Sequence, residues 1–372
     1  MADIDVALAG RSYRVKVGAG LLDRVHAEAH AFLDPYGKRA VPVVADENAR
    51  RLLGERLQAS LRSAGHAIDW YEVTPGEGSK SWAELERLTD WLLDRGITRS
   101  DHVFALGGGV VGDLVGFACA ILKRGCGFVQ LPTTLLAQVD SSVGGKTAIN
   151  ASAGKNLIGA FHQPALVLAD TGCLATLPQR EMRAGLAEVF KYGLLGDAGF
   201  FARVDKDSPA ILGCDDDTLE PVIAHCVGMK ARIVADDERE TKDARALLNF
   251  GHTFGHALEA ETGFSDRLLH GEAVALGMVL AARFSARRGL ISLADAERVA
   301  NALARAGLPT EIAALGLDCD GTTLAHHMRN DKKAEASTVP FILLRSLGEA
   351  FVARDVDLAD VAAFMDEQLR AH

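Results

Sequence analysis

The distribution of apolar and polar residues divides the chain into two parts with different patterns. Up to about residue 177, short apolar runs alternate with longer stretches in which leucine recurs at helical spacing. The short runs are typical of buried strands, and they cover residues 6–8, 13–17, 41–45, 70–73, 102–106, 128–131 and 165–169. Strands that alternate with helices in this way predict a mainly parallel sheet covered by helices.

The remainder of the chain has a mostly helical pattern. Long periodic stretches cover residues 181–193, 218–235, 245–261, 271–288, 292–306 and 358–370, and the next convincing strand after residue 177 is 341–344. We therefore predict the α/β fold class, with an N-terminal Rossmann-like parallel-sheet domain at residues 1–177. A C-terminal, mostly α-helical domain follows at residues 178–372, and the cleft between two such domains is the usual place for a site.

Composition and charge exclude several classes of function. The chain has a formal charge of -10, which argues against nucleic acid or an anionic membrane as its main partner. No apolar run is long enough to span a membrane, and the acidic N-terminus has no signal-peptide pattern. The six cysteines contain no Cys-x-x-Cys pair, which is typical of reduced thiols in a cytoplasmic protein.

A glycine-rich turn follows the strand predicted at 102–106. Residues 107–113 read Gly-Gly-Gly-Val-Val-Gly-Asp and precede a predicted helix. Glycine lets the backbone approach an anion, and a helix N-terminus favours negative charge, so we favour a dinucleotide site over a simple tight turn. The run matches neither Gly-x-Gly-x-x-Gly nor the Walker ending. Asp46 ends an earlier strand, where it is either a ribose ligand or a helix N-cap.

Three glycine-rich segments carry basic residues in this acidic chain. They are Lys123-Arg124-Gly125, the stretch from Asp140 to Lys146, and Gly154-Lys155-Asn156. Solvated surface is the usual explanation for Lys and Arg. Beside glycine turns and apolar residues, these groups instead predict a pocket for a substrate with several negative charges.

Histidines in the second part indicate a metal site. Arg245, Asn249, His252 and His256 have spacings that place them on one face of the helix predicted at 245–261, and His270 follows after a loop. Two histidines with a carboxylate and an open position are the pattern of a catalytic zinc site. The spacing does not decide which two of the three histidines bind metal, and the third is free to move protons or hold substrate.

Glu188 is the carboxylate that we choose for this metal. It lies among apolar and small residues in Ala-Glu188-Val-Phe-Lys191, on a predicted helix. The alternative is an ordinary ion pair with Lys191 at a spacing of i, i+3. Further on, the residues from Asn330 to Lys333 read on their own as a solvated, charged loop.

Eight separate motifs in order resemble the 3-dehydroquinate synthase family, within the sugar phosphate cyclase superfamily. They are Leu106-Gly-Gly-Gly-Val-Val-Gly-Asp113, Leu131-Pro-Thr-Thr-Leu-Leu136, Val139-Asp-Ser-Ser-Val-Gly-Gly-Lys-Thr147, Gly154-Lys-Asn-Leu-Ile-Gly159, Ala187-Glu-Val-Phe-Lys191, Asn249-Phe-Gly-His-Thr-Phe-Gly-His256, His270-Gly-Glu272 and Asp331-Lys-Lys333. The match covers nearly the whole chain. It implies a shikimate-pathway lyase that converts 3-deoxy-D-arabino-heptulosonate 7-phosphate to 3-dehydroquinate and phosphate. It also implies transient oxidation by NAD, β-elimination of phosphate, reduction and an intramolecular aldol step.

The resemblance also implies roles for individual residues. It places a zinc or cobalt ion on Glu188, His252 and His270, and leaves His256 beside the substrate as a non-ligand. The other residues expected to act on substrate are Arg124, Asp140, Lys146, Asn156, Lys191, Lys230, Arg245, Asn249 and a lysine of the Lys332-Lys333 pair, with Lys333 preferred. The residues expected around NAD are Asp46, Glu77, Lys80, Gly109, Val110, Val111, Gly112, Asp113, Thr133, Thr134, Lys146, Lys155 and Thr176. Arg124 is expected to reach the neighbouring subunit's site, which implies a homodimer.

Three other functions share some of these sequence features. A related cyclase would act on a sugar phosphate without a carboxylate, but the cations Lys230 and Arg245 favour a carboxylate-bearing substrate. The basic segments disfavour a plain metal- and NAD-dependent alcohol dehydrogenase. A non-catalytic NAD-binding protein is disfavoured because Glu188, His252 and His270 are all present. The stretch from Glu240 to Arg245 is one residue longer than is usual in the family, so Glu240 is given no role.

Overall fold

The computed structural model describes residues 1–152, 154–240, 243–331 and 339–370. The chain divides into two compact units, Met1–Pro178 with Cys214–Arg239, and Gln179–Gly213 with Glu240–His372. Relative to the two ranges predicted from sequence, the difference is the segment 214–239. It joins the first unit because its helix α8 (Asp216–Asp236) packs on strands β1 and β2.

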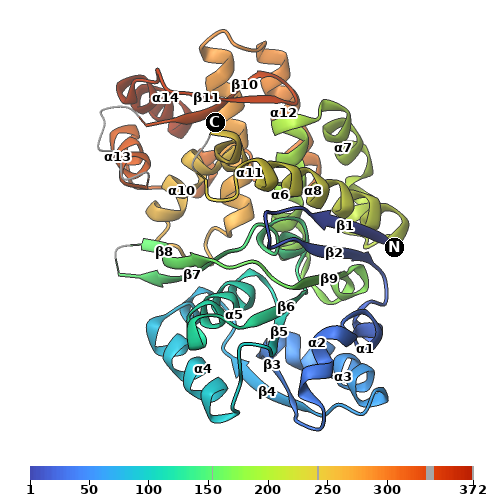
Figure 1. Cartoon of the computed structure of the whole chain (residues 1–372). Helices are drawn as coiled ribbons and strands as arrows, with labels where there is room; N and C mark the ends of the chain where they lie inside the picture. The colour runs from blue at the N-terminus through green and yellow to red at the C-terminus, as the bar shows by residue number, and fades with distance from the viewer. Residues whose placement is uncertain (153, 241–242, 332–338, 371–372) are drawn as a thin grey trace. The chain divides into compact units, whose positions relative to one another are not determined.

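A seven-stranded sheet with the order β1-β2-β9-β6-β5-β3-β4 forms the centre of the first unit (Figure 1). Its strands are β1 (Ala2–Val6), β2 (Tyr13–Gly18), β3 (Val41–Asp46), β4 (Ile68–Val73), β5 (His102–Gly107), β6 (Gly127–Pro132) and β9 (Leu166–Asp170). The β1–β2 hairpin is antiparallel and the other pairs are parallel, as the alternating pattern predicts. From β3 onward the strands follow the doubly wound order 2-1-3-4-5, which places the topological switch point between β3 and β5.

Helices cover both faces of this sheet (Figure 1). On one side lie α1 (Val25–Glu28), α2 (His30–Leu33) and α3 (Glu47–Ser63), and on the other lie α4 (Trp82–Asp94) and α5 (Gly109–Ile121). In α4, Leu85, Leu88 and Leu92 are buried at helical spacing. Burial of one such side chain contributes about 1.5–3 kcal/mol, so the apolar face holds the helix against the sheet.

A second hairpin, β7 (Lys146–Ala151) with β8 (Gly154–Phe161), was absent from the elements expected from sequence. The sequence predicts glycine-rich segments here, whereas the structure pairs them as antiparallel strands packed on α5. A Cβ at Gly159 would lie 2.1 Å from the Thr147 carbonyl oxygen, so the glycine is needed for the two strands to approach. Lys146 and Lys155 therefore lie on strands rather than on loops.

The second unit is mostly helical, as predicted. Its helices are α6 (Gln179–Gly196), α7 (Ala198–Leu212), α9 (Asp243–Ala246), α10 (His252–Glu261), α11 (His270–Arg287), α12 (Leu293–Arg305), α13 (Gly321–Asp331) and α14 (Leu358–Arg370), and its hairpin is β10 (Phe341–Ser346) with β11 (Glu349–Ala353). The rings of Phe254, Phe284, Phe341 and Phe364 pack together with centroids 5.2 to 6.3 Å apart. This cluster joins α10, α11, α14 and β10 in one core.

The single helix predicted over residues 245–261 is wrong. The chain forms α9, then the turn η7 (Leu247–Asn249), and then α10. Gly251 has φ +83°, a left-handed conformation that ends one helix before the next begins. Arg245 and Asn249 therefore do not share a helix with His252 and His256.

Shorter helical turns complete the described structure. They are η1 (Leu22–Arg24), η2 (Asp34–Tyr36), η3 (Glu77–Ser79), η4 (Leu122–Arg124), η5 (Ala137–Ser141), η6 (Thr171–Thr176) and η8 (Ile312–Leu315). The loop predicted at 330–333 is partly helical, because α13 ends at Asp331, while Lys332 and Lys333 lie outside the described residues.

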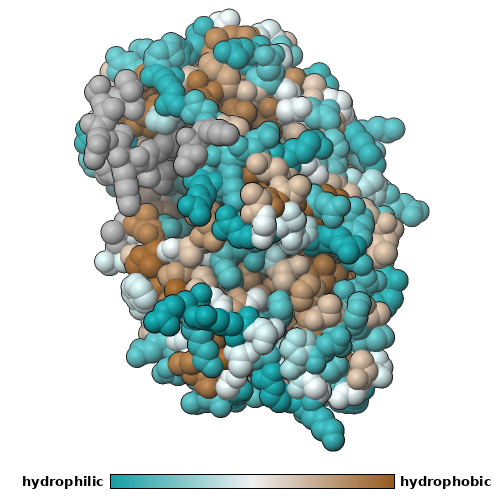
Figure 2. Space-filling model, in the orientation of Figure 1, coloured by the Kyte–Doolittle hydropathy of each residue, from teal (hydrophilic) through white to brown (hydrophobic). Residues whose placement is uncertain are grey.

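Hydrophilic residues cover most of the face drawn in Figure 2, and hydrophobic ones occur there in small separate patches. Among the described helices, none combines the length and apolar composition that crossing a bilayer requires.

Candidate active site

Glu188, His252 and His270 come together in the second unit from three different helices. Glu188 lies in α6, while His252 and His270 are the first residues of α10 and α11. The Oε1 atom of Glu188 lies 3.5 Å from Nε2 of His252 and 3.6 Å from Nε2 of His270. Two ligands with bonds of about 2.0–2.2 Å at a tetrahedral angle lie about 3.3–3.6 Å apart. The three side chains therefore fit around one metal ion.

Glycines let these three helices approach closely enough to form the cluster. A Cβ at Gly271 would lie 2.0 Å from the Ala184 carbonyl oxygen of α6. On the other side of α11, a Cβ at Gly277 would lie 1.9 Å from the carbonyl oxygen of Gly251. Any side chain at either position would push α11 away from α6 or α10, because packed backbones leave no room for another atom.

Lys191 forms an ion pair with Glu188, and this ion pair is compatible with metal binding by Glu188. The Nζ of Lys191 lies 2.5 Å from Oε2 of Glu188, and each side chain is only 1% exposed. The histidines face the other oxygen, Oε1. The ion pair predicted as an alternative therefore leaves Oε1 available for a metal.

The environment gives the two histidines opposite protonation behaviour. Burial lowers the pKa of His252 to about 3, so its ring is neutral near pH 7. Burial acts in the same direction on His270, but hydrogen bonds to Glu188 and Glu259 outweigh it and raise the pKa of His270 to about 10. A neutral His252 offers a lone pair to a cation, and at His270 a metal ion would take the place of a proton.

The other residues predicted in this unit lie in different environments. The His256 ring centroid is 5.3 Å from that of His252 and 6.0 Å from that of His270, so all three histidines cluster. His256 and His270 also form a second possible ligand set, with Glu259. Arg245 is 2% exposed and Asn249 is half-buried at the end of η7.

In the first unit, the glycine-rich turn lies at the switch point of the sheet. Gly107 ends β5, and Gly108 precedes α5 without any side-chain cap. Among the described residues, no acceptor takes the backbone N–H groups of Gly109, Val110 and Val111. An uncapped helix start at a switch point is suited to a phosphate group.

Side chains and small residues shape the space around this turn. A Cβ at Gly112 would lie 2.9 Å from Oε1 of Gln130, so glycine permits this approach. Asp46 caps α3, because its Oδ1 accepts the N–H groups of Asn48 and Ala49. The N-cap role predicted for Asp46 is confirmed, and its Oδ2 would lie 3.0 Å from a Cβ at Gly107.

The threonines predicted near the nucleotide lie at the ends of strands and turns. Thr133 and Thr134 follow β6, and the Oγ1 of Thr134 accepts the N–H of Ala137 at 3.1 Å. Thr176 ends η6 and donates to the Cys173 carbonyl oxygen at 2.8 Å.

A hydrogen-bond network joins four of the predicted residues. Lys80 is 3% exposed, and its Nζ donates to Oδ2 of Asp113 at 2.6 Å and to Oδ1 of Asn156. Burial raises the pKa of Asp113, and Lys80 acts in the opposite direction. Asn150 accepts the Asn156 N–H at 3.0 Å and donates to Oε2 of Glu77 at 2.9 Å. Asn150 was not predicted, although it lies between the motifs that contain Lys146 and Asn156.

Two further predicted cations of this unit differ in burial. Lys230 in α8 is 7% exposed, and its Nζ lies 2.8 Å from the backbone oxygen of Asp140 and 3.0 Å from Oδ1 of Asp140. Arg124 is exposed in η4, where its φ is +68°. Within the described part of the chain, Arg124 forms no ion pair.

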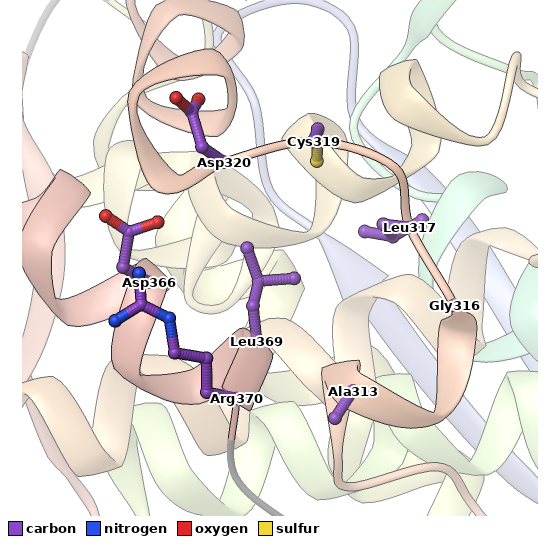
Figure 3. A pocket seen from close by; sticks show the side chains of 8 residues that line it. All are labelled: Ala313, Gly316, Leu317, Cys319, Asp320, Asp366, Leu369 and Arg370. Atoms are coloured by element: carbon purple, nitrogen blue, oxygen red, sulfur yellow. The ribbon is translucent and has the colours of Figure 1, made fainter.

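Two cavities in the second unit lie apart from the predicted residues. One, of about 370 Å³, is lined by Ala313, Gly316, Leu317, Cys319, Asp320, Asp366, Leu369 and Arg370 (Figure 3). Its carboxylates already serve the fold, because Asp320 accepts the Thr323 N–H and Asp366 accepts the Gly321 N–H. The other, of about 470 Å³, is lined by Ala202, Asp205, Lys206, Ser208, Pro209 and Arg305.

The fold and its clusters define a class of enzymes that combine a nucleotide-binding α/β unit with a helical metal-binding unit. Residues 70–184 match the family model for the N-terminal part of 3-dehydroquinate synthase, and residues 185–334 match the model for its C-terminal part. The chain belongs to the 3-dehydroquinate synthase family. Its activity is that of the family, the formation of 3-dehydroquinate with loss of phosphate in the shikimate pathway.

Relatives match along almost the whole chain. The 3-dehydroquinate synthase of Caulobacter vibrioides is 53% identical over 98% of this chain and 98% of its own length. That of Zymomonas mobilis is 50% identical over 98% of this chain and 96% of its own length. A solved 2-epi-5-epi-valiolone synthase from Streptomyces hygroscopicus, with NAD+ and Zn2+ bound, is 29% identical with a TM-score of 0.87. That similarity covers 96% of this chain and 97% of the solved one.

Proposed function

We propose that the chain carries out its family's reaction, from 3-deoxy-D-arabino-heptulosonate 7-phosphate to 3-dehydroquinate, with one divalent metal ion, zinc or cobalt, on Glu188, His252 and His270 and with NAD at the start of α5. The observation that carries the proposal is the convergence of Glu188, His252 and His270 at separations suited to one ion. When bound, NAD takes up and returns a hydride, and the metal ion polarises the alcohol that is oxidised.

In this proposal the second unit holds the metal ion and moves protons. Glu188, His252 and His270 are the ligands, and Lys191 balances the charge of Glu188 through its other oxygen. His256 lies outside this ligand group, and its ring, which lies beside both ligand histidines, acts on the substrate in this proposal. Asn249 contributes a polar contact to the substrate.

The first unit holds the nucleotide. The N–H groups at the start of α5 receive the pyrophosphate, since the helix dipole and the open donors favour a negative charge. The proposed NAD-binding residues are Asp46, Glu77, Lys80, Gly109, Val110, Val111, Gly112, Asp113, Thr133, Thr134, Lys146, Lys155 and Thr176. The hydrogen bonds of Lys80 fix the segment after η3 relative to α5 and to the β7–β8 hairpin.

Cations select a substrate with a carboxylate and a phosphate. Lys230, held by Asp140, and the buried Arg245 are assigned to the carboxylate, because a cationic side chain forms short, charge-assisted hydrogen bonds with a carboxylate. Lys146, Asn156 and Arg124 contact the rest of the substrate. Lys333, proposed for the same task, lies outside the described residues.

The proposal includes a homodimer in the cytoplasm. The exposed Arg124, with its left-handed backbone, is available to a neighbouring subunit. All six cysteines are free thiols, which is typical of a reducing compartment.

The proposal is tested by phosphate release from the heptulosonate phosphate, with and without NAD and a chelator. One equivalent of NAD per site should support many turnovers without net NADH. The Glu188→Ala, His252→Ala and His270→Ala variants should lose bound metal and activity together, whereas the His256→Ala variant should retain metal. Stoichiometric NADH formation would indicate a dehydrogenase, and full activity of metal-free protein would exclude the metal assignment.

A further inference from the structure

Glu259 is a buried carboxylate in the second unit that the proposed function leaves without a role. It lies in α10, is 3% exposed, and its Oε2 is 3.1 Å from Nδ1 of His270. The other ring nitrogen of His270, Nε2, faces Oε1 of Glu188 at 3.6 Å. The imidazole therefore lies between two carboxylates, with one nitrogen directed at each.

We propose that Glu259 is a positioning residue that holds His270 for metal binding. It accepts a hydrogen bond from the Nδ1–H group and so leaves the Nε2 lone pair directed at the metal. A carboxylate behind a ligand histidine fixes the tautomer and the ring orientation, and it makes the ligand nitrogen more basic. This inference rests on the proposed metal site of Glu188, His252 and His270.

The same hydrogen bond decides between two overlapping sets of possible ligands. One set is Glu188, His252 and His270, and the other is His256, Glu259 and His270. When Nδ1 of His270 carries the proton that Glu259 accepts, that nitrogen has no lone pair for a metal. The set of His256, Glu259 and His270 then cannot use Nδ1 of His270 as a ligand. The set of Glu188, His252 and His270 still has Nε2 of His270 available for the metal.

The backbone of His270 is held separately from its ring. Glu272 accepts the Leu269 N–H at 2.9 Å and pairs with Arg180 through two bonds of 2.7 Å, which fixes the start of α11. With the backbone fixed, the remaining freedom of His270 is rotation of its side chain. Glu259 is the described group that restrains this rotation on the side opposite Glu188.

The test compares Glu259→Met with Glu259→Gln in the full-length protein. Methionine keeps the volume of the buried side chain but accepts no such hydrogen bond, whereas the glutamine carbonyl still accepts one. Zinc affinity, measured by competition with a chromophoric chelator, should fall about 10–100-fold in Glu259→Met and recover most of that loss in Glu259→Gln. The visible spectrum of bound Co2+ should change in Glu259→Met, because a turned ring alters the coordination geometry.

A matched control is available on the same helix. The Oε2 of Glu261 lies 3.0 Å from Nε2 of His327, so it forms the same kind of pair with a histidine outside the proposed ligands. Glu261→Met should leave zinc affinity and the Co2+ spectrum unchanged. Urea unfolding of each metal-free variant then separates loss of stability from loss of metal affinity.

Three results would overturn the inference. One is a Glu259→Met variant that is less stable but binds zinc with unchanged affinity and an unchanged Co2+ spectrum. Another is an equal loss of affinity in the Met and Gln variants. The third is metal that remains in Glu188→Ala but is lost in His256→Ala, which refutes the proposed metal site itself and is distinct from the other two.

Discussion

At the scale of single residues, the two charges of the Lys191–Glu188 pair are the most consequential. Both side chains are 1% exposed, so removal of the lysine leaves a carboxylate in a medium that solvates it poorly. We expect Lys191→Met to lower the free energy of unfolding of the metal-free protein by at most about 3–5 kcal/mol, because the protonated His270 still offsets part of the charge of Glu188. A bound divalent ion supplies the missing positive charge, so the loss should be smaller with saturating zinc. Urea unfolding with and without zinc measures both values.

Lys206→Met is the matched control, because Lys206 is exposed on α7 of the same unit. Its effect should stay within about 0.5 kcal/mol in both conditions. An equal loss for Lys191→Met with and without zinc would mean that the lysine acts on something other than the charge of Glu188.

At the scale of elements, the distance between helices controls the metal cluster. In Gly271→Ala the new Cβ would lie 2.0 Å from the Ala184 carbonyl oxygen, so α11 has to move away from α6. We expect the free energy of unfolding to fall by about 1–3 kcal/mol, as is usual for overpacking. Zinc affinity should fall as well, because His270 in α11 moves away from Glu188 in α6. Chelator competition and urea unfolding measure the two effects.

Gly228→Ala provides the control for an added methyl group in a helix. The nearest atom to a Cβ at Gly228 is 3.9 Å away, and alanine is the better helix former. This variant should be at least as stable as the wild type and should bind zinc normally. If Gly271→Ala also binds zinc normally, close contact between α11 and α6 is not what sets the metal geometry.

At the scale of the whole molecule, the proposed homodimer makes each active site depend on two chains. Arg124→Ala and His270→Ala should each be inactive when purified alone. In a mixed dimer, the chain that carries Arg124→Ala keeps its metal ligands and receives Arg124 from the partner. When equal amounts of the two variants exchange subunits at random, about half of the dimers are mixed, and each mixed dimer has one complete site out of two. The mixture should therefore recover roughly a quarter of wild-type phosphate release.

The reassortment needs two checks. Mixing each variant with itself should restore nothing, and size-exclusion chromatography with light scattering should show a dimer before and after mixing. No recovery from verified mixed dimers would mean that Arg124 serves the site of its own chain.

Much of the fold follows from local patterns in the sequence. The strands β3, β5, β6 and β9 are buried on both faces because helices cover both faces of the sheet, so they show in the sequence as nearly continuous apolar runs. Leucines at helical spacing likewise mark α3 and α4. The β7–β8 hairpin was not predicted, because its glycines and lysines have low strand propensity. Its pairing also depends on packing against α5, which the local sequence does not show.

The sequence by itself determined the set of chemical groups in this protein, and the tertiary structure decided how those groups meet. Glu188, the three histidines and the glycine-rich turn were identified from residue type and spacing. Spacing along the chain could not show that a left-handed Gly251 separates Arg245 and Asn249 from the helix that carries His252 and His256. Nor could spacing show that Glu259 forms a hydrogen bond with Nδ1 of His270, since these two residues lie on different helices. The periodicity of a sequence shows which face of a single helix is apolar. A metal site depends instead on the distances between helices. In this protein, close backbone contacts at Gly271 and Gly277 determine those distances.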